Sequence, residues 1–224
     1  MENVFSLETD RFYQEILPDQ ERKVFASISA QGFRKALEIR STFNNGCEPC
    51  FKPLFHHALI HSVEDFLIEA CKSKSLHSEV IYSRSKNANR YPYVEYLSAT
   101  GLQWHFKYCR QKRALAPQSS YRKERALFND GLNLFFDFDT NTDGSTFYKL
   151  NSGKIFGILE LGYFDSEPTF LQVVFPDTEY KRSVATLDLT SYLKKEFRSS
   201  EEHEEFISEQ KTVTGLKKIA RTGA

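Results

Sequence analysis

The stretch YVEYLSATGLQWHFKY, residues 93–108, decides the fold class of this chain. Apolar and polar residues alternate on both sides of residues 99–101, and a period of two is that of a β-strand. The stretch therefore predicts two strands joined at Ala99–Gly101. Alternate positions of the second strand give an apolar face, Leu102, Trp104, Phe106 and Tyr108, and a polar face, Gln103, His105 and Lys107.

Upstream of these strands the apolar period changes to that of a helix. After Pro18, which suits a first helical turn, apolar residues recur at steps of three and four to about residue 43. Gly32 lies on this stripe, where its missing side chain permits another element to pack closely. A second amphipathic helix is expected after Pro53, and the two are predicted to pack as a hairpin.

Three further strands are expected downstream, over residues 132–138, 154–163 and 169–175. FDSEP, residues 164–168, is typical of a hairpin connection between the last two. No helix-length segment separates the strands after residue 130, which predicts a largely antiparallel sheet.

Together these elements predict an α+β fold with an N-terminal helical hairpin, a central, largely antiparallel β-sheet and a C-terminal helix starting at Thr190 or Ser191. We expect residues 1–75 to form the helical region and residues 76–190 a β-rich region packed with it as one domain. Residues 191–224 are expected to hold the C-terminal helix and a basic tail.

Composition is that of a globular protein. Of the 224 residues 40% are hydrophobic, and no run of about 18 apolar residues predicts a membrane helix. The start, MENVFSLETD, lacks the basic and then apolar layout of a secretory signal. Four cysteines in a chain of this length do not make a disulfide framework. We therefore expect a cytoplasmic protein without membrane contact.

Charge is unevenly distributed along the chain although the formal net charge is zero. Residues 71–125 carry 12 basic and 3 acidic side chains, whereas residues 1–70 carry 7 and 11 and residues 126–224 carry 11 and 16. Lysine and arginine neutralise phosphates, and the aromatic residues interleaved with them can stack on unpaired bases. The basic block therefore predicts a surface for nucleic acid or for an acidic protein. The alternative is that the block pairs with the acidic ends of this same chain.

The predicted contact residues come from the polar face of the second strand and from the segments that flank the strand pair. They are Arg84, Lys86, Arg90, Gln103, His105, Lys107, Arg110, Lys112, Arg113, Arg122, Lys123 and Arg125.

A possible zinc site lies in CEPCFKPLFHHALIH, residues 47–61. Cys47 and Cys50 are two residues apart, and His57 and His61 are one helical turn apart, so the four could bind zinc tetrahedrally. The alternative is a cysteine pair that happens to precede a polar helix face, because no second cysteine pair supports the metal.

A carboxylate set suggests metal-assisted phosphodiester chemistry. Asp137 and Asp139 share a face if their strand extends that far, and Glu160 lies on the next strand. Such carboxylates could bind Mg²⁺, which would activate water for a nuclease. The lysine that usually follows the glutamate by two residues in such enzymes is missing, because Gly162 occupies its position.

The leading expectation is a non-catalytic intracellular binding protein, regulatory or of the host–parasite kind found in phages and toxin–antitoxin pairs. Its basic, aromatic β-face would bind nucleic acid or an acidic macromolecule, without a cofactor. One alternative is a Mg²⁺-dependent nuclease that uses Asp137, Asp139 and Glu160. The other is a protein–protein interaction module, such as an inhibitor or antitoxin.

Overall fold

The alternating stretch at residues 93–108 forms two antiparallel strands, as predicted. β3 (Pro92–Ser98) and β4 (Leu102–Tyr108) pair through Tyr96 opposite Trp104 and Leu97 opposite Gln103. The chain turns between them at Gly101, whose φ of 90° is accessible to glycine at no steric cost.

The structure is a computed structural model that describes most of the chain. The described residues are 4–6, 9–43, 48–84, 92–112, 115–130, 132, 147–149, 153–164 and 167–198.

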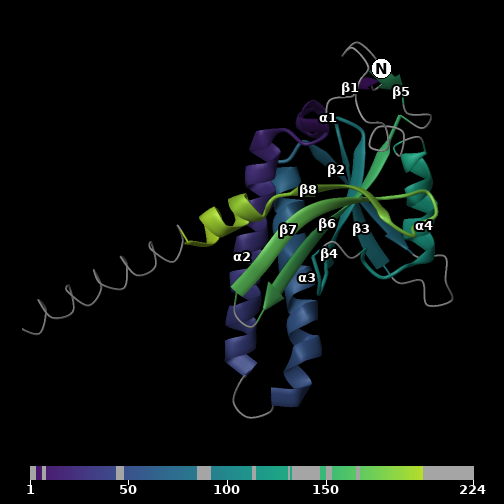
Figure 1. Ribbon diagram of the computed structural model, residues 1–224. Coiled ribbons are helices and arrows are strands. Elements are labelled where there is room, and N and C mark those ends of the chain that lie inside the picture. The colour runs from purple at the N-terminus through teal and green to yellow at the C-terminus, as the bar shows by residue number, and fades with distance from the viewer. Residues whose placement is uncertain are drawn as a thin grey trace, which may run out of the picture.

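β3 and β4 belong to an open six-stranded sheet with the strand order β2-β3-β4-β6-β7-β8 (Figure 1). β4 and β6 are parallel, and every other neighbouring pair is antiparallel, so the prediction of a largely antiparallel sheet is confirmed. The remaining strands are β2 (Ser78–Arg84), β6 (Ile155–Phe164), β7 (Glu167–Pro176) and β8 (Ser183–Asp188).

The hairpin predicted at residues 164–168 joins β6 to β7, with Phe164 opposite Glu167. A separate two-stranded sheet pairs β1 (Val4–Ser6) with β5 (Phe147–Lys149). Of the strand predicted over residues 132–138, all but Leu132 lies outside the described residues.

The N-terminal helices form the predicted hairpin of two long antiparallel helices (Figure 1). These are α2 (Asp19–Phe43) and α3 (Glu48–Lys72), preceded by the shorter α1 (Thr9–Ile16). α3 begins five residues before Pro53, earlier than predicted, because Pro49 is itself suited to a first helical turn. The C-terminal helix begins at Thr190, as predicted, and is described over residues 190–198.

Opposite faces of the sheet are covered by the helical hairpin and by α4 (Ser120–Ala126), which continues into η1 (Leu127–Asn129). The ring of Trp104 lies 4.6 Å from that of Phe25 on α2. The ring of the next strand residue, His105, lies 5.3 Å from that of Tyr121 on α4. Since consecutive strand residues point to opposite faces, α2 and α4 lie on opposite sides.

The apolar core is shared between the hairpin and the sheet. Phe25, Leu59, Val63, Trp104 and Phe175 belong to one cluster and are each at most 1% exposed. Burying a side chain of this size contributes about 1.5 to 3 kcal/mol, so this shared cluster holds the hairpin on the sheet. None of the helices in the described ranges has the length and hydropathy needed to cross a lipid bilayer.

At Gly32 the backbones of α2 and α3 approach closely, in agreement with the role predicted for this glycine. A Cβ atom at this position would lie 2.4 Å from Cγ2 of Val63 and 2.9 Å from the Val63 Cα atom. The second contact is with backbone, so a rotamer change of Val63 could not relieve it.

Replacing Gly32 with alanine should lower the free energy of unfolding by about 2 kcal/mol, because the two helices must separate. The overpacking outweighs the gain of about 1 kcal/mol that alanine brings to a helix interior. Urea denaturation measures the change, and Gln31→Ala on the exposed side of α2 is the matched control. A stabilised Gly32→Ala protein would contradict the close contact.

Candidate functional site

A cleft opens where the end of β2 and the start of β3 meet α4. It has a volume of about 260 Å³ and is lined by Ser83, Arg84, Tyr93, Ser120, Tyr121, Glu124 and Arg125. Two of these, Arg84 and Arg125, belong to the basic surface that the sequence predicts. The fold therefore brings together two predicted residues that are far apart in the chain.

Two tyrosines form an aromatic wall of the cleft. The rings of Tyr93 on β3 and Tyr121 on α4 are stacked, with centroids 4.0 Å apart and planes 17° from parallel. Burial raises the pKa of both phenols, so both stay neutral at physiological pH. The pair presents an uncharged aromatic surface and also joins α4 to the sheet.

Arg125 is held in the cleft by a carboxylate of the sheet. Its Nε and one terminal nitrogen donate to the two oxygens of Glu95, each at 2.9 Å. Glu95 is completely buried, whereas the Arg125 side chain is 29% exposed. Hydrogen bonding to Glu95 raises the pKa of Arg125, which stays charged. The bidentate pair fixes the guanidinium plane, and its other terminal nitrogen makes no hydrogen bond to any described residue.

Arg122 anchors the opposite side of α4 in the interior. Its Nε donates to Nε2 of His105 at 3.0 Å, and a terminal nitrogen donates to the carbonyl of Pro117. Its guanidinium also lies over the Tyr121 ring, 5.1 Å from the centroid. Burial, with Arg122 and Lys107 nearby, lowers the pKa of His105 well below its usual value. His105 is therefore a neutral acceptor at Nε2.

The open polar face predicted for β4 is covered in the structure. Gln103 is 2% and His105 3% exposed, so neither belongs to an accessible surface. Lys107 is half-buried, and burial lowers its pKa. The reason is topological: β4 and β6 are parallel neighbours, so the chain must cross a face of the sheet between them, and α4 is part of that crossover.

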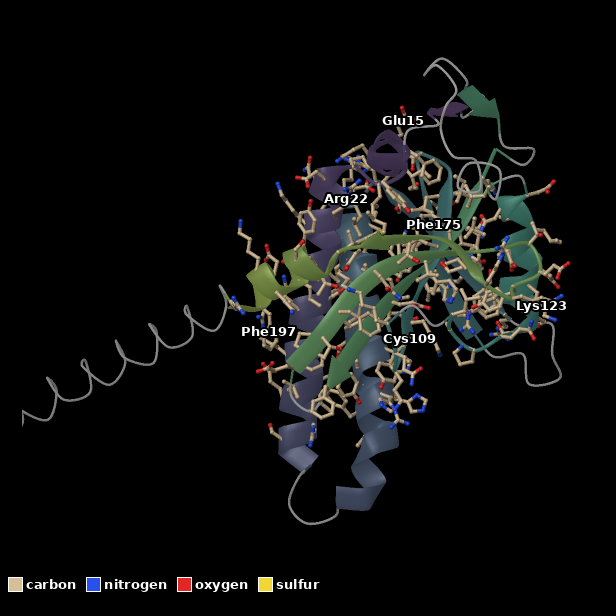
Figure 2. All side chains as sticks on the ribbon, viewed as in Figure 1. Glu15, Arg22, Cys109, Lys123, Phe175 and Phe197 are labelled. Carbon is tan, nitrogen blue, oxygen red and sulfur yellow. The ribbon has the colours of Figure 1, made fainter. Side chains whose placement is uncertain are left out.

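The other predicted basic residues divide into three groups. Arg122 and Arg125 make the internal contacts described above. Four are exposed, of which Lys112 pairs with Asp188 at 2.6 Å, and Lys123 lies on the side of α4 that faces away from the sheet (Figure 2). The exposed residues are Arg84, Arg110, Lys112 and Lys123. Lys86, Arg90 and Arg113 lie outside the described residues.

Glu160, predicted as a nuclease carboxylate, is buried in β6 with both oxygens engaged. One accepts the amide N–H of Ala116 at 3.0 Å and the other the side-chain amide of Gln172 at 2.8 Å. Burial raises the pKa of Glu160 to about 7. Through these contacts Glu160 binds the crossover segment at Ala116 and the neighbouring strand at Gln172. The other two predicted carboxylates, Asp137 and Asp139, lie outside the described residues.

Of the possible zinc ligands, His57 and His61 are exposed on α3, and Nδ1 of His61 lies 3.8 Å from the Glu64 carboxylate. Cys47 lies outside the described residues, and the side chain of Cys50 is not described. Within the described ranges, no three histidine, cysteine or acidic side chains are grouped so that they could bind a metal ion. The zinc site stays a prediction.

Sequence reasoning missed most of what shapes the cleft. Tyr93 and Tyr121 were visible only as aromatic residues among basic ones, and Glu95 gave no signal as the partner of Arg125. No helix was predicted at α4, because its seven residues are too few for a clear helical period. Comparison with protein-family models, with curated proteins and with solved structures gave no match to this chain.

Proposed function

We propose that this protein is a non-catalytic nucleic-acid-binding protein whose contact surface is centred on the cleft between β2, β3 and α4. The observation that carries the proposal is the meeting of two arginines with a stacked tyrosine pair in one accessible cleft. Arginine donates to phosphate oxygens in a fixed fork geometry, and tyrosine faces stack on bases.

Charge around the cleft supports the same partner. Glu95 compensates Arg125 from inside the sheet, and the exposed Glu124 also lines the cleft. The positive charge available to a ligand therefore comes from the exposed Arg84 in the cleft and from Lys123 on the outer side of α4. In the sequence, Lys86 and Arg90 lie between the two strands that line the cleft. Cations on both sides of a cleft attract a polyanion and release its counterions on binding.

Neither Cys71 nor Cys109 forms a disulfide, which supports an intracellular, reducing location and suits a cytoplasmic protein. Burial raises the pKa of both thiols, that of Cys71 to about 11, so they are packing residues and poor nucleophiles. We place the protein among regulatory or host–parasite binding proteins of the phage or toxin–antitoxin kind. The alternative is an inhibitor or antitoxin that binds an acidic protein through the same charges.

Reversing both exposed charges, with Arg84→Glu and Lys123→Glu in one protein, should weaken oligonucleotide binding at least tenfold. The reason is that two phosphate contacts become repulsions, so the slope of log K against log salt should fall by about 2. Fluorescence anisotropy measures this with labelled oligonucleotides of DNA and RNA, single-stranded and duplex, between about 50 and 200 mM salt.

The matched control is Lys194→Glu with Lys195→Glu, which makes the same change in net charge on the exposed side of the C-terminal helix. The control should leave the affinity within about twofold of the wild type. Equal weakening by both double variants would contradict a localised surface. Wild-type protein that binds none of the oligonucleotides would overturn the proposed function and leave the acidic-protein alternative.

A further inference from the structure

We infer that the cleft holds a single unpaired base, so that the protein selects single-stranded over double-stranded nucleic acid. The inference rests on the proposed function and deepens it, because it states which form of the polymer the cleft accepts.

The small size of the cleft suits a single base. Its volume of about 260 Å³ lies below the range of roughly 300 to 1,000 Å³ that is typical of sites for whole small molecules. A continuous duplex could touch the rim of such a cleft but could not enter it. An unpaired base can enter, because its faces and edges are not occupied by a partner strand.

The tyrosine pair has the geometry of a stacking platform. Tyr93 and Tyr121 both line the cleft, and their rings are stacked face to face with centroids 4.0 Å apart. Tyr121 therefore supports the Tyr93 ring from behind, and a base would stack on the outer face of Tyr93. Stacking on aromatic faces tolerates every base, because every base has a π-face.

The platform is braced from behind before any ligand arrives. The guanidinium of Arg122 lies over the Tyr121 ring, and the edge-to-face contact with His105 fixes the same ring against β4. The Tyr93 ring, stacked on this fixed ring, loses little conformational entropy when a base stacks on it, which favours binding.

The two arginines of the cleft have different roles. Arg125 is fixed by its bidentate contact with Glu95, so its guanidinium can present its remaining donors in a defined direction. Arg84 is the last residue of β2 and is exposed, so it can follow the phosphate of a nucleotide seated between them. A stacked base with a neighbouring phosphate contact is the arrangement by which proteins bind single strands.

Tyr93→Leu tests the inference, because it removes the ring on which a base would stack and leaves every charge in place. Its affinity for a single-stranded oligonucleotide of about 20 residues should fall about tenfold, with an unchanged salt slope. Tyr93→Phe, which keeps the ring, should restore wild-type affinity. The matched control is Phe164→Leu, which removes an exposed aromatic ring (80% exposed) at the β6–β7 connection, outside the cleft, and should change nothing.

Single strands of DNA and of RNA are measured beside the DNA duplex of the same sequence, by anisotropy on the full chain. We expect wild-type protein to prefer one or both single strands over the duplex by at least tenfold, and Tyr93→Leu to remove most of that preference. Equal affinity of wild-type protein for single strand and duplex would overturn the inference. The inference would also be overturned if Tyr93→Leu lost affinity for single strand and duplex to the same extent. In either case the sensitivity to Arg84→Glu and Lys123→Glu would still uphold the proposed function.

Discussion

Replacing Asn129 with alanine should lower the free energy of unfolding by roughly 4 kcal/mol, because one buried amide satisfies three backbone groups of the sheet. Its Nδ2 donates to the carbonyls of Phe156 at 3.0 Å and Pro176 at 2.7 Å. Its Oδ1 accepts the N–H of Phe156 at 2.8 Å. Asn129 itself is 1% exposed, so water could replace these contacts only by entering the interior.

The need for this residue follows from the end of β7. Extending the register that pairs Ile158 with Val174 would put Phe156 opposite Pro176, which has a carbonyl but no N–H. Pro176 therefore cannot donate to the carbonyl of Phe156, and the Asn129 amide group donates to this carbonyl and to that of Pro176 instead.

Urea denaturation of Asn129→Ala measures the loss, with Gln118→Ala, an exposed position on the same crossover, as the control. Asn129→Asp has nearly the same shape but no donors when ionised, so it should be at least as unstable at neutral pH. A loss of less than about 1 kcal/mol in Asn129→Ala would show that the three groups find other partners.

Replacing Glu160 with glutamine should stabilise the protein by about 3 kcal/mol at pH 8 and have little effect near pH 4.5. Burial raises the pKa of Glu160 from its usual value of 4.5 to about 7 in the folded chain. Between these two values the folded state binds more protons than the unfolded state, so the free energy of unfolding falls as pH rises. Above pH 7 the whole cost of a buried charge is present in the wild type and absent from the variant.

The hydrogen-bond network around residue 160 can accept a neutral side chain. The glutamine carbonyl can still accept the N–H of Ala116, as Glu160 does at 3.0 Å. Gln172 has a buried Oε1 atom with no partner among the described residues, and rotation of its amide would turn this oxygen toward the new donor. The variant therefore removes the charge while a hydrogen bond to each neighbour stays possible.

Chemical denaturation at several pH values between about 4 and 8 measures the difference between Glu160→Gln and the wild type. Glu167→Gln, which removes an exposed carboxylate at the start of β7, should follow the wild type at every pH. Burial also raises the pKa of Glu64 to about 7, and this contribution is common to both proteins and cancels in the comparison. A Glu160→Gln protein that is less stable than the wild type at pH 8 would show that the ionised carboxylate is favoured.

Much of the fold was predictable because it rests on local periodicity. The apolar stripes of α2 and α3, the turn at Gly101 and the β6–β7 hairpin each follow from spacings within a few residues. β8 and α4 were not predicted, because six or seven residues with mixed burial carry no clear period.

The candidate site was predictable only in part, since charge in a sequence does not say whether its partner is a ligand or the protein itself. Arg84 and Arg125 of the basic block line the cleft, but Arg122 and Arg125 also serve as internal anchors of α4. Their partners, His105 and Glu95, come from neighbouring strands, and no spacing in the sequence links them to α4.

The sequence by itself determined the α+β class, the helical hairpin and the largely antiparallel sheet, because amphipathic periods specify which side of each element must be buried. Only the tertiary structure decided that the polar face of β4 is buried as well as the apolar one. The parallel pairing of β4 with β6 requires a crossover, and that crossover buries Gln103 and His105 while it brings Tyr121 onto Tyr93. Long-range pairing of strands is a property of the whole sheet, and the cleft exists because of it.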